Sequence, residues 1–125
     1  MKVQFLIDNK KSWIISFIKN FIIRNKKKYN LSLIHNHNSI KKSDITFILS
    51  SLKKISPSHL KKSKNNIVIH PSKLPKGKGF SPLEWQVLEG KNKIWITAIE
   101  ANNNFDSGEI YYQNSFLLKG TELKN

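Results

Sequence analysis

The sequence predicts an α/β fold in which helices flank an open, mostly parallel sheet. Short apolar runs typical of buried strands occur at residues 3–7, 45–49 and 67–69. An amphipathic helical pattern follows the first of these runs, and Pro- or Ser-initiated helical segments precede and follow the last. The 125 residues are enough for one domain, so we expect a single domain over residues 1–125.

The first predicted strand covers residues 3–7, and the loop after it leads to Ser12 as the cap of a helix. Apolar residues recur on one broad face of this helix: Ile14, Ile15, Phe17, Ile18, Phe21 and Ile22. This face predicts core packing against the sheet. Trp13 lies off the face in the first turn, where it either walls a ligand pocket or packs on the surface.

The turn between the first strand and the helix contains no glycine, because residues 8–12 read Asp-Asn-Lys-Lys-Ser. A dinucleotide site needs glycines there, since only they let the backbone approach a pyrophosphate. The sequence therefore excludes a nicotinamide or flavin site.

Two histidines, His35 and His37, follow the second predicted strand at residues 31–34. Alternate histidines can share a metal, but no third ligand is evident, so we expect an exposed loop and no metal. The third strand at residues 45–49 follows after a connector too short for a normal crossover helix. We interpret this as the loss of a helix between the two strands.

A short helix at residues 57–62, with Ser56 as its cap and Pro57 in its first position, leads into the central strand. His70 follows the apolar residues of that strand. In open α/β sheets, ligands bind outside the carboxyl ends of the strands. His70 is therefore a candidate catalytic residue, although spacing alone fits a structural histidine equally well.

The last predicted helix covers residues 81–88, with Pro82 in its first position and Gly90 after its end. Leu83 and Val87 are expected to face inward.

Another strand at residues 94–99 precedes one or two more within residues 108–118, among which we expect an antiparallel edge. An exposed edge strand of this kind leaves room for a homodimer.

The formal net charge of +14 invites a nucleic-acid interpretation. The lysines are spread over the whole chain, however, and Arg24 is the single arginine, whereas readers of base sequence favour arginine. A lysine-coated surface that steers anionic substrates explains this charge distribution better than a nucleic-acid site does.

The apolar stretch at residues 13–23 is too interrupted for a signal peptide or membrane span, so we expect a cytoplasmic protein without a membrane partner.

Two blocks in the second half carry a family resemblance. His70-Pro71-Ser72-x-Leu74-Pro75 is followed by Lys76-Gly77-Lys78-Gly79, Pro82, Trp85 and Gly90, and residues 105–110 read Phe-Asp-Ser-Gly-Glu-Ile after an Asn-rich loop. Together they resemble the 10-formyltetrahydrofolate-dependent formyltransferases. Within that family, the Lys-Gly-Lys-Gly and Glu-Trp-Gln segments are most similar to amino-sugar formyltransferases, and the similarity to methionyl-tRNA formyltransferases is weaker.

The resemblance implies a shortened, Rossmann-like catalytic domain without its C-terminal helix or a second domain. It also implies that His70 and Asp106 are the catalytic pair. The histidine would hydrogen-bond the developing oxyanion or act as a proton carrier. The aspartate would orient and charge the histidine and assist deprotonation of the amine through water. The family's third catalytic residue is an asparagine two positions before the histidine, and here Val68 stands in its place.

The same resemblance implies 10-formyltetrahydrofolate as co-substrate and no metal. We predict contacts with the folate from Ser72, Leu74, Pro75, Lys76, Gly79, Asn102, Asn103 and Asn104. We predict contacts with the acceptor substrate from Asn9, Trp13, Lys73 and Lys78. Trp85 is expected to pack within its helix rather than to stack on a ligand.

The expected function is formyl transfer to a primary amine, that of a nucleotide-linked amino sugar. One alternative is a methionyl-tRNA formyltransferase-like protein, although a nucleic-acid partner is not expected. Another alternative is a truncated, non-catalytic folate-binding or interaction module, which Val68 favours.

Overall fold

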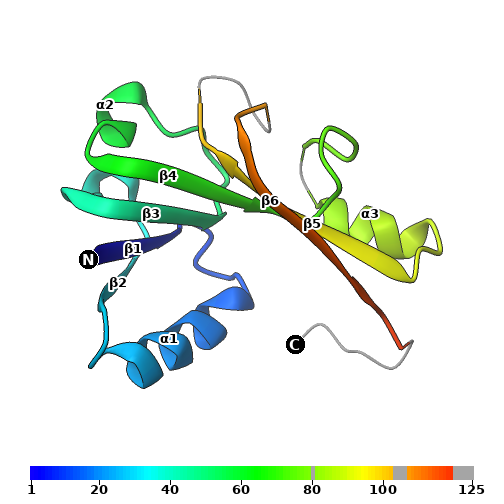
Figure 1. Ribbon diagram of the computed structural model, residues 1–125, viewed down its shortest axis with the longest axis horizontal. Helices are drawn as coiled ribbons and strands as arrows, with labels where there is room; N and C mark the ends of the chain where they lie inside the picture. Colours follow the sequence, from blue (N-terminus) through cyan, green and yellow to red (C-terminus); the bar gives the residue numbers. More distant parts are fainter. Residues whose placement is uncertain (80, 103–106, 120–125) are drawn as a thin grey trace. The chain divides into compact units, whose positions relative to one another are not determined.

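The computed structural model describes residues 1–79, 81–102 and 107–119, which fall into two compact units, Met1–Ile67 and Val68–Asn125 (Figure 1). The described residues contain six strands: β1 (Lys2–Ile7), β2 (Asn30–Ile34), β3 (Ser43–Ser50), β4 (Ser63–His70), β5 (Lys93–Glu100) and β6 (Ile110–Leu117). They follow the order β2-β1-β3-β4-β5-β6. β1 pairs in parallel with β2 and β3, whereas β5 and β6 are antiparallel. The predicted fold class is confirmed.

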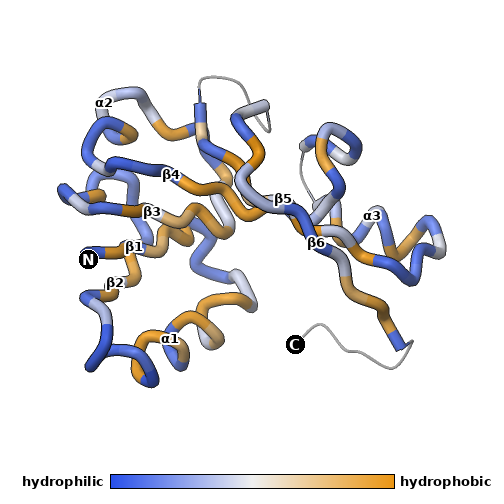
Figure 2. The backbone as a smooth tube through the Cα atoms, viewed as in Figure 1, coloured by the Kyte–Doolittle hydropathy of each residue, from blue (hydrophilic) through white to orange (hydrophobic). Residues whose placement is uncertain are grey.

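β1 is the buried centre of the first unit because its residues from Val3 to Ile7 are all removed from solvent. It pairs with β2 from Lys2 opposite Asn30 to Leu6 opposite Ile34, and with β3 on its other side. Because both faces of β1 are buried, its side chains are mostly apolar. Figure 2 shows this apolar stretch in orange. The buried polar residue Gln4 donates hydrogen bonds through Nε2 to the Lys41 carbonyl and the Ser43 hydroxyl.

Helix α1 (Ile14–Asn25) is preceded by Trp13 at the N-cap position, one residue after the predicted cap Ser12. The Ser12 hydroxyl still accepts a hydrogen bond from the Ile14 amide at 3.4 Å. The helix packs on β1 through an edge-on contact between Phe21 and Phe5, whose ring centroids are 5.9 Å apart. The predicted core face is buried only in part, because no residue of α1 is fully removed from solvent. Ile14, Ile15, Ile18 and Ile22 are half-buried, whereas Phe17 is 57% exposed.

The connector between β2 and β3 contains only the short 3-10 helix η1 (His37–Ser39), so the prediction that it is too short for a normal crossover helix is confirmed. The predicted exposed loop is wrong at the two histidines. His35 Nδ1 lies 2.9 Å from the carbonyl oxygen of Ile7, and His37 Nε2 lies 2.9 Å from Asp8 Oδ2. Both histidines are half-buried because β2 lies beside β1, so residues that follow one strand meet those that follow the other.

Asp8 is further held by the Ser51 hydroxyl and the Leu52 amide, which donate hydrogen bonds of 2.9 and 2.7 Å to its carboxylate. No group of three or more metal-ligating side chains occurs within residues 1–79, 81–102 and 107–119.

Helix α2 (Pro57–Leu60) has the predicted cap, because the Ser56 hydroxyl accepts a hydrogen bond from the His59 amide. Asn66 in the following strand β4 donates through Nδ2 to the Leu60 carbonyl at 2.8 Å. This amide therefore ties β4 back to α2 within the first unit.

Helix α3 (Pro82–Leu88) in the second unit ends before Gly90, whose φ of 75° is in the left-handed region that glycine favours. The expected inward orientation of Val87 is wrong, since Val87 is 52% exposed. The expected packing of Trp85 is also wrong, since Trp85 is 61% exposed. The buried residue is Gln86, and its position on the helix turns both neighbours outward.

β6 pairs with β5 from Lys93 opposite Leu117 to Ile99 opposite Ile110, which confirms the predicted antiparallel edge. None of the helices within the described part of the chain has the length and apolar character needed to cross a membrane.

Candidate active site

His70 is the last residue of β4, and its side chain is 6% exposed. Its Nε2 atom lies 2.7 Å from the carbonyl oxygen of Gly77. A carbonyl can only accept, so Nε2 carries the proton of this hydrogen bond. The imidazole is therefore engaged by the loop at residues 71–79, and Gly77 has to move before Nε2 can donate to a reacting oxygen.

The loop at residues 71–79 closes on itself through Ser72. The Ser72 amide donates to the His70 carbonyl at 2.9 Å, and the Ser72 hydroxyl donates to the Lys76 carbonyl at 2.8 Å. Ser72 is buried, so these hydrogen bonds form away from competing water.

Thr97 of β5 and Gln113 of β6 anchor this loop. The Thr97 hydroxyl donates to the Ser72 carbonyl at 2.6 Å and accepts from the Leu74 amide at 3.3 Å. Gln113 Nε2 donates to the Leu74 carbonyl at 2.8 Å and to Thr97 Oγ1 at 3.0 Å. Sequence reasoning missed both residues. For Thr97 the signal was a polar residue inside an otherwise apolar strand, which does not identify its partner. Gln113 gave no such signal, because β6 is mostly exposed and has polar neighbours.

Gln86 of α3 is a third anchor that sequence reasoning missed. Its Nε2 donates to the carbonyl of Pro71, and its Oε1 accepts from the Trp95 amide of β5 at 3.3 Å. One buried amide thus connects the loop, the helix and the strand, which fixes the start of the loop next to His70.

Gly77 has a φ of 74°, and a Cβ added there would lie 2.7 Å from the Ser72 Cβ. We expect Gly77→Ala to destabilise the protein by about 2 kcal/mol, because strain in the left-handed region and the contact with Ser72 add together. Gly90→Ala is the matched control, since Gly90 has nearly the same φ, 75°, but no heavy atom within 4 Å of the added Cβ. Urea denaturation of both variants should show about half the loss for Gly90→Ala. Equal losses would mean that Ser72 moves aside at no cost.

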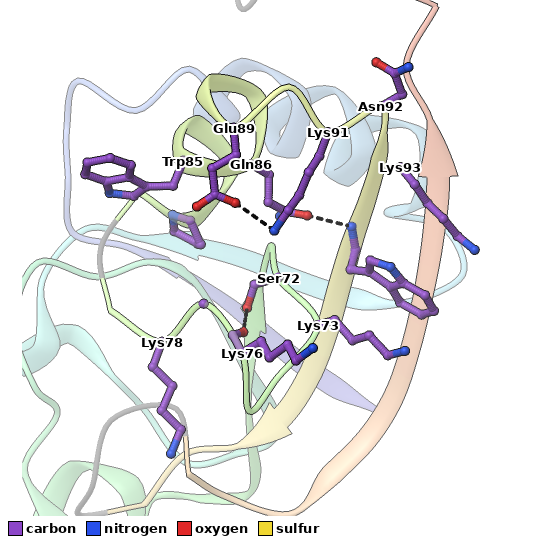
Figure 3. Close-up of a pocket in the computed structure, with 13 residues that line it drawn as sticks. Ser72, Lys73, Lys76, Lys78, Trp85, Gln86, Glu89, Lys91, Asn92 and Lys93 are labelled. Carbon is purple, nitrogen blue, oxygen red and sulfur yellow. Dashed lines mark hydrogen bonds and ion pairs between the residues drawn. The ribbon is translucent and has the colours of Figure 1, made fainter.

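A pocket of about 610 Å³ lies against the outer side of the loop (Figure 3). The predicted residues Ser72, Lys73, Lys76 and Lys78 line it. Residues that were not predicted also line it, from α3, the turn after it and the start of β5: Trp85, Gln86, Glu89, Lys91, Asn92, Lys93 and Trp95. The volume falls within the usual range for small-molecule sites.

The predicted folate-contacting residues divide by exposure. Leu74 and Ser72 are buried, so their side chains support the loop from inside. Pro75, Lys76 and Gly79 are exposed on it.

The second catalytic prediction, Asp106, lies outside the described residues, as do Asn103 and Asn104. Asn102 is described and exposed, and its Oδ1 accepts a hydrogen bond from the Ser107 hydroxyl at 3.3 Å. A role for these residues in folate binding or catalysis stays a prediction.

The predicted acceptor-binding residues Asn9 and Trp13 lie in the first unit, at the turn after β1. Asn9 Oδ1 accepts from the Lys11 amide at 3.1 Å, which stabilises the turn. Trp13 is 40% exposed and rests edge-on against Phe17, with ring centroids 5.8 Å apart. This geometry fits a surface-packed tryptophan, and ligand contacts from either residue stay predictions.

The chain is similar to known proteins in both sequence and fold. The family model for formyl transferases matches residues 2–123. A curated methionyl-tRNA formyltransferase from Buchnera aphidicola is 38% identical over 56 residues, which are 45% of this chain and 17% of that protein.

Two solved structures share the fold. Methionyl-tRNA formyltransferase from Clostridium thermocellum has a TM-score of 0.77 at 23% identity, over 94% of this chain and 54% of its own. The sugar 3N-formyl transferase WlaRD, solved in the presence of dTDP and 5-N-formyl-THF, has a TM-score of 0.67 at 20% identity, over 95% of this chain and 53% of its own. The chain thus spans about half the length of these solved structures.

Proposed function

The chain belongs to the formyl transferase family, and from that premise we propose that it transfers a formyl group from 10-formyltetrahydrofolate to a primary amine. The observation that supports this most directly is the buried His70 at the carboxyl end of β4, covered by a loop that β5, β6 and α3 anchor. A buried imidazole under an anchored loop suits a reaction that requires a positioned proton donor.

In the proposed reaction, the nitrogen lone pair of the amine attacks the formyl carbon and creates a tetrahedral oxyanion. The bond between the formyl carbon and folate N10 then breaks, N10 takes a proton, and the former amine loses one. Once Gly77 has released Nε2, His70 would hydrogen-bond the oxyanion or carry the proton that the amine loses and N10 gains. Asp106 would orient the imidazole. Pre-positioned donors of this kind stabilise the transition state because they need no reorganisation during the reaction.

The acceptor we propose is the amine of a nucleotide-linked amino sugar, which the Lys76-Gly77-Lys78-Gly79 and Glu84-Trp85-Gln86 segments support. A sugar formyltransferase is also among the structures that share the fold. Methionyl-tRNA is the second candidate, because curated relatives with that name match the chain.

The proposal is tested by incubating the purified protein with 10-formyltetrahydrofolate and either amino-sugar nucleotides or methionyl-tRNA, while tetrahydrofolate release and acceptor formylation are measured. We expect formylation of an amino-sugar nucleotide. If methionyl-tRNA is formylated and no amino-sugar nucleotide is, methionyl-tRNA is the acceptor. If neither acceptor is formylated and no tetrahydrofolate is released, the non-catalytic module is favoured instead.

A cofactor prediction accompanies this assay. The protein should bind 5-formyltetrahydrofolate and should not bind nicotinamide dinucleotides, because the turn at residues 8–12 lacks the glycines that a pyrophosphate needs. Isothermal titration with both ligands measures this directly. Tight nicotinamide binding without folate binding would reverse the assignment.

Val68→Asn tests the position where the family's catalytic asparagine is missing. Val68 lies two residues before His70 in β4, so both side chains point to the same face of the sheet. An amide there should raise turnover by ~10-fold or more, because one oxyanion donor is typically worth ~10²- to 10³-fold. The free energy of unfolding should fall by about 1–3 kcal/mol, since the half-buried amide lacks a partner until substrate binds.

Ile69→Asn is the control for Val68→Asn, because Ile69 is also half-buried but points to the opposite face. It should lower stability without raising turnover. A wild-type protein that is already fast, and that Val68→Asn slows, would show that another donor serves the oxyanion.

A further inference from the structure

The formal charge of the protein is concentrated in the first unit, Met1–Ile67. Fifteen of the 22 lysines and arginines lie there but only two of the eight acidic residues, Asp8 and Asp44, so this unit carries +13 of the formal +14. Both carboxylates already have partners, since Asp8 lies 2.9 Å from His37 and Asp44 lies 2.8 Å from Lys64. Lysines are spread along the whole chain, but the acidic residues that would balance them are not. The first unit therefore attracts polyanions.

Helix α1 of this unit exposes an aromatic stripe beside the face that packs on β1. Trp13, Phe17 and Phe21 recur every four residues, which places them along one side of the helix. They are 40%, 57% and 46% exposed. Trp13 rests edge-on against Phe17, so the two rings form one continuous apolar surface. Three exposed aromatic side chains in a row differ from the singly scattered apolar residues of an ordinary surface, and such patches mark interaction sites.

Cations lie at both ends of the aromatic stripe. Lys10 and Lys11 precede it in the turn after β1, and Arg24 and the three lysines at residues 26–28 follow it. All six side chains are exposed. Figure 2 shows α1 as a largely apolar helix that runs into a hydrophilic turn. Aromatic rings between cations are typical of a helix that lies on a membrane, with the rings at the acyl boundary and the cations among the headgroups.

This arrangement suits a lipid surface better than a nucleic acid. Bases stack on the open faces of aromatic rings, whereas the edge-on contact between Trp13 and Phe17 covers a ring face. Arg24 is the single arginine of the chain, although forked phosphate recognition favours arginine. A lipid surface makes no such demand, because lysine contributes to binding anionic headgroups through its charge alone. The interrupted apolar pattern that excludes a membrane span is compatible with a helix of which only one side enters lipid.

We propose that α1 attaches the protein peripherally to a membrane surface rich in anionic phospholipid. Trp13 and Phe17 enter the boundary between headgroups and acyl chains, and the flanking cations lie among the headgroups. This replaces the expectation of no membrane partner, which was based on the lack of a span. The proposal does not depend on formyl transfer, because it uses only residues 10–28 of the first unit.

The test is co-sedimentation of the purified protein with vesicles of phosphatidylcholine alone and of equal parts phosphatidylcholine and phosphatidylglycerol. We expect binding to the mixed vesicles, little binding to the neutral ones, and a loss of affinity as salt is raised. Phe17→Ser should weaken binding to the mixed vesicles by about 10-fold, because the exposed part of the ring no longer transfers into lipid. Lys27→Gln should weaken it by about 3- to 5-fold.

Leu88→Ser and Lys93→Gln are the matched controls, because they remove an exposed apolar side chain and an exposed cation from the second unit. Both variants should bind the mixed vesicles as the wild type does. Phe17→Leu keeps an apolar side chain and should retain most of the affinity. It therefore separates the loss of apolar surface from a loss of folding in Phe17→Ser.

The proposal is overturned if the mixed vesicles do not bind the protein, or if Phe17→Ser binds them as well as Leu88→Ser does. It is also overturned if Lys27→Gln and Lys93→Gln weaken binding equally, since the effect would then be one of net charge. Without vesicle binding, affinity for a short RNA that Phe17→Ser weakens would assign the surface to nucleic acid. A dimer that Phe17→Ser dissociates in analytical ultracentrifugation, again without vesicle binding, would assign it to a second copy of the chain.

Discussion

His70→Gln is expected to slow formyl transfer by about 10²- to 10⁴-fold, the usual contribution of a positioned acid–base group. Glutamine places an amide N–H near the position of the imidazole Nε2, so the hydrogen bond to the Gly77 carbonyl can be retained. The substitution therefore removes the acid–base chemistry and leaves the loop contact. Single-turnover formylation with saturating donor measures the loss, and folate affinity should change little.

His59→Gln is the matched control for this prediction. His59 is half-buried in α2 of the first unit, where its Nδ1 lies 3.0 Å from the Ser56 hydroxyl, so the exchange perturbs a comparable contact away from the loop. It should leave the rate unchanged. If His70→Gln lowers only the free energy of unfolding and the protein still formylates at the wild-type rate, His70 is a structural histidine and the catalytic assignment is wrong.

The strand pattern of this fold could be predicted from the sequence because most strands are short apolar runs bounded by polar turns. His70 was placed correctly at the end of β4 for the same reason. The edge strand β6 was predicted only in outline. Its residues are mostly exposed, so burial does not impose a clear apolar pattern on them.

The contacts that position the 71–79 loop could not be predicted, because each joins residues far apart in the sequence. Thr97 and Gln113 are separated by 16 positions, and Thr97 is 25 positions from Ser72. A buried threonine in an apolar strand signals that a partner exists, but the register of β5 and β6 decides which residue it meets. Helix α3 illustrates the same limit, because apolar spacing favoured Val87 over the polar Gln86 that is buried.

The two histidines after β2 were misjudged for a related reason. The Asn- and Ser-rich composition around His35 and His37 predicts an exposed loop. Their partners, Ile7 and Asp8, lie at the end of β1, and that proximity follows from strand order rather than local composition.

Gly108→Ala is expected to have the largest effect on stability, with a loss of about 3 kcal/mol, the upper end of the usual cost of overpacking. A Cβ at Gly108 would collide with the carbonyl group of Glu100, and both groups belong to the backbone. Backbone atoms cannot swing aside as a flexible side chain can. The Glu100 amide also donates to the Glu109 carbonyl at 2.8 Å, so the start of β6 cannot move away without breaking this hydrogen bond.

Urea denaturation measures the loss of stability in Gly108→Ala, and formyl transfer should fall with it, because Glu100 and Gly108 bracket the segment that carries Asp106. Glu109→Ala is the control, since this neighbouring side chain is exposed and its removal should change the free energy of unfolding by no more than about 0.5 kcal/mol. The pairing of β5 and β6 already shifts register between Ala98 and Ile99, which shows that this end of the hairpin departs from a regular ladder. A Gly108→Ala protein as stable as Glu109→Ala would mean that the irregular end opens at little cost, and the close approach to Glu100 would then not explain the glycine.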